Sequence, residues 1–332
     1  MDSLLFALCA VAPIIIVVLL GYFLRKINLV SKDTAKNLNK IVFRVLVPAN
    51  LFLSVYKIES IKDVNPAFVL YAMAATLVLF ALGVVTLRLA TNEEKRKGVL
   101  LQAVFRSNYA LIGVSLVEEL FGGEGTGSAA LLAAFIIPLY NVLAVIALTV
   151  LEPIGEGEQR RKIDVCKIVV GIFKNPLVLS ILTALLMLGV REIFTSLDVG
   201  FRLSNITPVF SVIDMLSRSA TPIALIALGA GFEFSAVKEL RREIIWATVA
   251  RLIFVPLLTI GIAVAFFNFT GHEYAAFIAA FASPVAVSSV PMAQEMKGDT
   301  ELAGQIVVWT TIFSSVTLFL TIFILRLIGV LI

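Results

Sequence analysis

Long apolar runs separated by short polar stretches set the pattern of this chain. A helix needs about 20 apolar residues to cross about 30 Å of hydrocarbon, and runs of that length recur from end to end. The pattern predicts an all-α polytopic membrane protein with ten spans, five in each half: 3–24, 38–58, 66–90, 98–121, 128–151, 174–192, 205–234, 243–267, 273–296 and 303–330. We expect two domains, 1–151 and 174–332, joined by a cytoplasmic linker at 152–173.

Composition agrees with the membrane class. With 60% hydrophobic residues, 15% charged residues and a mean hydropathy of +1.01, the 332-residue chain lies outside the soluble globular range. The first run exceeds the apolar core of a signal peptide, and Asp2 rather than a basic region precedes it. We therefore expect it to remain as a membrane helix.

The two halves repeat one another. Four positions recur at a constant spacing of 174: Arg44, Pro48, Leu51 and Glu59 return as Arg218, Pro222, Leu225 and Glu233. Because each half has an odd number of predicted spans, the second half begins on the opposite side of the membrane. The repeat is therefore predicted to be inverted, an arrangement that permits alternating access in secondary transporters.

Lysine and arginine predict the orientation. Alternate connections between the predicted spans hold 18 basic residues, whereas the remaining connections hold four. Basic loops stay preferentially in the cytoplasm, so both termini are expected outside it, in a multi-pass protein of the cell membrane. The same loops account for the pI of 9.1 without a nucleic-acid partner.

Five of the 27 basic residues remain outside these connections, and all are arginine: Arg44, Arg106, Arg218, Arg251 and Arg326. Arginine stays protonated and offers a planar fork to carboxylates, which favours anion binding. A structural interpretation also exists for Arg44 and Arg218, because each lies four residues before a proline that leaves a backbone carbonyl without its donor. Their guanidinium groups would satisfy that carbonyl, and Arg251, ahead of Pro256, is interpreted in the same way.

Segments 105–122 and 281–298 align at a spacing of 176 and place polar or helix-breaking residues at mid-membrane. These residues are Ser107, Asn108, Gly113 and Ser115 in the first segment, and Ser283, Pro284, Ser288, Ser289 and Pro291 in the second. Broken helices are tolerated in a membrane only where they face protein or a watery cavity, and paired breaks indicate a transporter's binding site. Their new N-terminal amides suit a carboxylate. The alternative is a pair of kinked, continuous helices.

Energy coupling stays open between protons, sodium and the membrane potential. Candidate groups for a coupling ion are Asp214, Glu119, Gln294 and Glu295, each of which could instead be an ordinary interfacial residue. Two cysteines and one histidine supply no material for a metal cluster or a catalytic triad. Neither a cofactor, a metal nor an enzymatic activity is expected.

Four stretches resemble the auxin efflux carrier family, which includes bacterial malate permease-like and plant PIN-type proteins: LLGYFLRKINLVSKDTAKNLNKIVFRVLVPANLFLS (19–54), FRSNYALIGVSL (105–116), IPLYNVLAVIAL (137–148) and SPVAVSSVPMAQEMKGDTELAG (283–304). The resemblance implies two inverted five-helix repeats, with a scaffold of helices 1, 2, 6 and 7 and a transport unit of helices 3–5 and 8–10. It also implies that an organic anion binds where helices 4 and 9 cross, and that two chains pair through their scaffolds.

Matched residue by residue, Asn108 and Gly113 correspond to the family's Asn and Gly in helix 4, and Pro291 to the crossover proline of helix 9. Ser115 stands where plant members have proline. Arg106 and Asn141 lie in the same motifs and complete the candidate substrate-binding set. The expected function is elevator-type transport of small mono- or dicarboxylates such as malate. The alternatives are a sodium-coupled symporter of the bile-acid-carrier type and a non-transporting sensor on the same fold.

Overall fold

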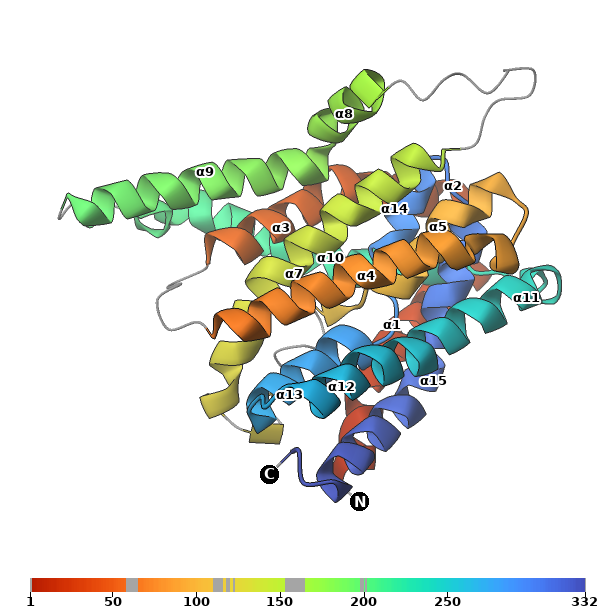
Figure 1. Ribbon diagram of the computed structural model, residues 1–332. Helices are drawn as coiled ribbons and strands as arrows, with labels where there is room; N and C mark the ends of the chain where they lie inside the picture. The colour runs from red at the N-terminus through yellow and green to blue at the C-terminus, as the bar shows by residue number, and fades with distance from the viewer. Residues whose placement is uncertain are drawn as a thin grey trace.

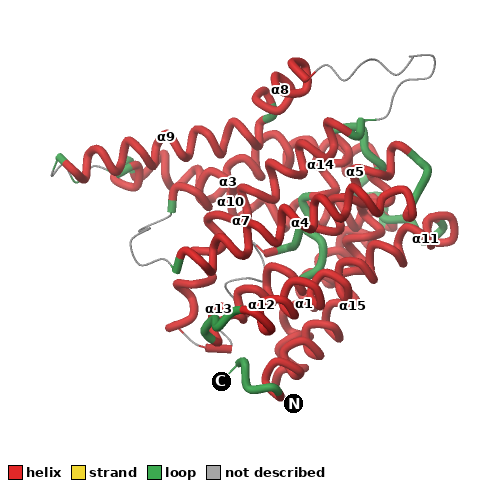
Figure 2. Tube along the Cα trace, in the orientation of Figure 1, coloured by secondary structure: helices red, strands yellow, loops and turns green. Residues whose placement is uncertain are grey.

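The computed structural model describes residues 2–57, 65–109, 116–117, 120–121, 123–152, 165–197, 200 and 202–331. Over these residues the protein is a bundle of helices, and Figures 1 and 2 show no strand arrows or strand colour in it. The one β-type pairing among them is an isolated antiparallel bridge between Ser107 and Val285. Both termini lie at the same end of the molecule (Figure 1).

The first half holds α1 (Asp2–Lys26), α2 (Lys32–Ile41), η1 (Val42–Leu46), α3 (Val47–Tyr56), α4 (Pro66–Ala90), α5 (Glu94–Phe105) and α7 (Gly123–Val150). The second holds α8 (Val165–Lys174), α9 (Pro176–Ser196), η2 (Leu203–Asn205), α10 (Thr207–Gly231), α11 (Ala236–Val249), η3 (Ala250–Phe254), α12 (Val255–Phe266), α13 (Gly271–Phe277), η4 (Ile278–Ala282), α14 (Ser289–Glu295) and α15 (Thr300–Leu327). An Asn-Pro pair starts both α4 and α9, since the asparagine side chain caps the helix and proline suits its first position.

Seven described segments are long and apolar enough to cross a membrane: Lys32–Tyr56, Pro66–Ala90, Gly127–Val150, Pro176–Ser196, Thr207–Gly231, Ala236–Phe266 and Thr300–Leu327. The sequence predicted ten. Three predicted spans are therefore missing from this set of seven. The first of them, 3–24, coincides with α1. The other two, 98–121 and 273–296, do not form long helices among the described residues, because the helix breaks within each of them. Side chains on the outer helix faces, such as Leu89 and Phe266, are more than 70% exposed, as lipid-facing residues are.

Three π-helical turns, η1, η3 and η4, each end two residues before a proline: Pro48, Pro256 and Pro284. Proline lacks an N–H and its ring collides with the carbonyl four residues earlier, so a wider turn relieves the conflict. The predicted role of Arg44 and Arg218 at these kinks is wrong. Arg44 instead donates to Glu295 at 3.0 Å and Arg218 to Asp214 at 2.6 Å, with exposed fractions of 68% and 80%.

Helices of opposite halves pack against each other. α1 lies against α10, and α3 lies against both α9 and α10. Glycine permits the first contact, since a Cβ added to Gly229 would lie 1.9 Å from the Val18 carbonyl oxygen and one added to Gly21 would lie 2.3 Å from that of Ile226. The backbones of α1 and α10 are therefore closer than any side chain would allow.

Candidate functional site

Two helices stop in the interior and their ends are joined by backbone pairing. α5 ends at Phe105 because Arg106 is extended (φ −96°, ψ 115°), and η4 ends at Ala282 because Ser283 is extended (φ −71°, ψ 155°). Beyond these ends, the Asn108 N–H donates to the Pro284 carbonyl at 2.8 Å. Each interruption thus supplies hydrogen-bonding partners for the other, as buried non-helical backbone requires. We call residues 106–108 and 283–288 the junction.

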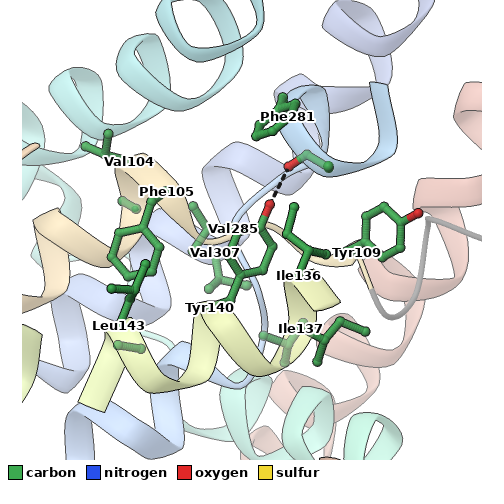
Figure 3. Packing of buried hydrophobic residues seen from close by; sticks show 14 of the residues in the cluster. Val104, Phe105, Tyr109, Ile136, Ile137, Tyr140, Leu143, Phe281, Val285 and Val307 are labelled. Carbon is green, nitrogen blue, oxygen red and sulfur yellow. Dashed lines mark hydrogen bonds between the residues drawn. The ribbon is translucent and has the colours of Figure 1, made fainter. Parts of the chain in front are cut away.

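A small cavity of about 60 Å³ lies at the junction. One wall is the junction itself, and the others come from α7, α3 and α10. Its polar lining consists of Asn50, Arg106, Ser107, Asn108, Tyr140, Asn141, Thr221 and Ser288. Figure 3 shows the apolar packing beside it, with Phe105, Tyr140 and Val285 gathered between α5 and α7.

Arg106 is 2% exposed, and its described partners are all neutral. They are Gln102 Oε1 at 3.0 Å, Asn141 Oδ1 and Ser288 Oγ at 2.8 Å each, and Met292 Sδ at 2.7 Å. None of the ion pairs among the described residues includes Arg106. A buried charge is costly unless an opposite charge or many hydrogen bonds compensate it, so this guanidinium favours a bound anion.

Asn108 adds an unused donor to the same cavity. The residue is 5% exposed, and its Nδ2 has no hydrogen-bond partner among the described residues. Asn141 is oriented by its own Nδ2, which donates to the Ile137 carbonyl at 2.7 Å, so that its Oδ1 faces Arg106. An uncompensated guanidinium beside a free amide N–H is a donor set that a carboxylate can satisfy.

Arg251 is the second buried arginine at the junction, and its surroundings differ. Its three guanidinium nitrogens each donate to a backbone carbonyl: Ser283 at 2.8 Å, Ala280 at 2.8 Å and Val104 at 3.2 Å. Tyr140 also donates to the Ala280 carbonyl, at 3.0 Å (Figure 3). The predicted role of Arg251 at its own proline kink is wrong. Its guanidinium does bind backbone carbonyls, but these belong to the ends of α5 and η4.

A family model described as membrane transport protein matches residues 6–322. The chain belongs to the auxin efflux carrier family. The resemblance inferred from the four stretches is thereby confirmed, and this auxin efflux carrier family member is a multi-pass membrane transporter.

Its relatives cover most of its length. An uncharacterized transporter of Methanothermobacter thermautotrophicus is 24% identical, and the alignment covers 93% of this chain and 95% of that transporter's length. The uncharacterized transporter MJ1031 of Methanocaldococcus jannaschii is 24% identical over 91% of this chain and 93% of its own. The uncharacterized transporter YfdV of Escherichia coli is 26% identical over 76% of this chain and 77% of its own.

The predicted substrate-binding residues of this auxin efflux carrier family member fall into three groups. The cavity is lined by Arg106, Ser107, Asn108, Asn141 and Ser288. Pro284 accepts the Asn108 hydrogen bond at the junction, while Ser289 and Pro291 are buried in α14 and do not line the cavity. Gly113 and Ser115 lie outside the described residues, as does the coupling-ion candidate Glu119.

The other coupling-ion candidates lie away from the cavity. Asp214 accepts from Lys57 at 3.2 Å and from Arg218, and Glu295 accepts from Arg44. Gln294 donates to the Lys36 carbonyl at 2.9 Å and accepts from Asn39 at 3.1 Å, lining a different cavity between α2 and α14.

Sequence reasoning missed Asn50 and Thr221, which line the cavity from α3 and α10. A signal for both was present. Each lies beside one of the repeated prolines, Asn50 two residues after Pro48 and Thr221 directly before Pro222, and each is polar within an apolar run. Polar residues beside a proline kink in a membrane helix can face a cavity, and this reasoning would have indicated both residues.

Proposed function

We propose that this carrier transports small organic anions, mono- or dicarboxylates such as malate, and binds them at the junction. One observation carries the proposal: buried Arg106 has only neutral partners described and shares a cavity with the unused Asn108 amide. The guanidinium and the Asn108 Nδ2–H group are both donors, so the cavity favours a ligand that brings negative charge.

Element lengths support an inverted repeat. α7 and α15 each have 28 residues, and their bounds differ by a constant 177 positions. α5 and the continuous α13–η4 helix differ by the same 177 at both ends, 94–105 against 271–282. The cross-half contacts follow the same relation, since α1 pairs with α10 as α9 pairs with α3. Two equivalent halves of five predicted spans permit alternating access.

We assign α1–α3 and α8–α10 to a scaffold and the remaining helices to a moving transport unit. The cavity supports this division because α3 and α10 line one side and the junction and α7 line the other. Polar contacts join the two units at one end, including Arg44 to Glu295 and Asn39 to Gln294. Elevator-type motion would exchange these contacts for others at the opposite end. The basic loops support both termini lying outside the cytoplasm, in the cell membrane.

Transport by purified protein in liposomes tests the proposal. Labelled malate, lactate and related acids should be taken up or exchanged, under proton, sodium and voltage gradients applied in turn. Arg106→Gln should lose this flux, whereas Arg88→Gln, at an exposed arginine, should retain it. The proposal fails if no acid in the panel is moved by the wild-type protein under any of the three gradients.

A further inference from the structure

We propose that Arg251 is a built-in cation at the junction, occupying the place where a bound coupling cation would otherwise hold the carbonyl ends of the two interrupted helices. This inference rests on the proposed function, because it concerns how the carrier is coupled. It assigns a positioning role to Arg251, which lies outside the residues that line the cavity.

The charge balance at the helix ends carries the first step. Val104 lies in the last turn of α5, and Ala280 and Ser283 lie at the end of η4, so their carbonyls have no intrahelical partner. The C-terminus of a helix carries roughly half a negative elementary charge. Two such ends therefore match one positive charge, and Arg251, which is 0% exposed, supplies it.

Geometry carries the second step. Carriers with interrupted helices use unwound backbone carbonyls and half-helix C-terminal ends to coordinate a sodium ion or proton. Here carbonyls from both ends already accept from the three nitrogens of one guanidinium, at 2.8, 2.8 and 3.2 Å. A second cation on these oxygens would lie within a few ångströms of a fixed positive charge in a low-dielectric interior, which is strongly unfavourable.

The local fold explains why the arginine reaches both ends. Arg251 lies in the π-turn η3, five residues before Pro256, and η3 packs against both α5 and η4. Arginine keeps its proton in protein interiors. Unlike a bound ion, this cation is therefore not released in each transport cycle, and it moves with the transport unit.

Two consequences distinguish this role from simple packing. Sodium should not stabilise the wild-type protein, and removing the side chain should create a site that small cations can fill. Both can be measured by thermal unfolding of the purified full-length protein, which does not require the substrate to be known. A failure of the proposed function, seen as absent anion flux, would leave these measurements unaffected.

The experiment compares sodium, potassium and choline chloride at equal ionic strength. The wild-type Tm should be the same in all three. Arg251→Ala should lower Tm by about 5 °C or more, and low concentrations of guanidinium chloride or sodium chloride, but not choline chloride, should restore part of the loss. Arg106→Ala serves as the matched buried control and should show no recovery with either cation.

The inference is overturned if sodium raises the wild-type Tm above its value in choline. It is also overturned if Arg251→Ala folds with an unchanged Tm, or is destabilised without any recovery by guanidinium or sodium. If Arg251→Ala does not fold, Arg251→Lys gives the second test. Its single ammonium can replace the charge but not the three-way contact, so a partly lowered Tm without sodium dependence supports the inference, and a sodium-dependent rise contradicts it.

Discussion

Arg106 and Arg251 are both buried arginines at the junction, yet they face opposite kinds of surroundings. Arg251 faces backbone carbonyls from two helix ends, whereas Arg106 faces neutral side chains and a cavity. The carbonyls carry the partial negative charge of helix C-termini, so they compensate Arg251 within the protein. Arg106 lacks such compensation among the described residues. The same residue type therefore stabilises the fold at position 251, and in our proposal it binds an anion at position 106.

The largest expected effect separates the two arginines by stability. Arg251→Ala leaves the buried carbonyls of Val104 and Ser283 without this donor, at about 1–3 kcal/mol each, while the Ala280 carbonyl keeps the bond from Tyr140. Arg106→Ala removes the donor from the side chains of Gln102, Asn141 and Ser288. These side chains can rotate to other partners, so the loss in the free energy of unfolding should be smaller. Chemical and thermal unfolding in detergent measure both. Equal destabilisation by the two variants would remove the distinction between them.

The second effect separates them by ligand binding. A hydrogen bond to a charged group contributes about 1.5–3 kcal/mol, so Arg106→Gln should weaken anion binding roughly 10- to 150-fold. Arg106→Lys keeps the charge but loses the planar fork, so its anion affinity should lie between those of the wild type and Arg106→Gln. Equilibrium binding of the labelled acid identified in liposomes is the measurement, with Arg88→Gln as control. Unchanged affinity in Arg106→Gln would place the anion elsewhere.

A substitution remote from both arginines shows how overpacking between two helices alone affects stability. Gly229→Ala drives a methyl group into the backbone of α1, which should cost about 1–3 kcal/mol or more. Gly231→Ala is the matched control, since a Cβ there meets nothing within 4 Å. Tm should fall in the first variant and not in the second, and neither should acquire sensitivity to sodium. Such sensitivity in Gly229→Ala would make the cation response of Arg251 variants unspecific.

A smaller effect sharpens the picture of the cavity around Arg106. Asn108→Ala removes one neutral donor, a contribution of about 0.5–1.5 kcal/mol, which corresponds to a roughly 2- to 10-fold loss of anion affinity. Asn37→Ala, at an exposed position of α2, is the control. If Asn108→Ala weakens binding as strongly as Arg106→Gln, the guanidinium is not the principal anion ligand.

The smallest effect concerns the Glu233 carboxylate, just after the end of α10, which pairs with Lys32 and Arg25. Lys32 and Arg25 lower the pKa of the Glu233 carboxyl below its ordinary value of 4.5 by hydrogen bonding. Its stabilising contribution is therefore complete above that value and is lost as pH falls through the lowered pKa. Because all three groups are partly exposed, the contribution should stay within about 1 kcal/mol. The Tm of wild type and Glu233→Gln should differ slightly at neutral pH and converge in acid. A difference that persists in acid would contradict this assignment.

Some of the site was predictable because its signal is local. Ser107, Asn108 and Ser288 are polar residues within the two aligned segments, which are otherwise mostly apolar, and all three line the cavity. Asn50 and Thr221 carried a weaker signal of the same kind and were overlooked. The separate roles of the arginines were not predictable, since Arg44, Arg106 and Arg251 look alike in sequence. What distinguishes them is which groups from distant helices surround each guanidinium.

The sequence by itself determined the membrane class and the family, because apolar run length and motif order are properties of the chain, and its constant spacing predicts that the halves are equivalent. Tertiary structure decided how the junction is built. Pairing of Asn108 with Pro284, and of Arg251 with Val104, Ala280 and Ser283, joins residues more than 140 positions apart or on different helices. Such contacts depend on how the helices pack, which no local pattern encodes. That Arg106 has no charged partner among the described residues is a product of that packing.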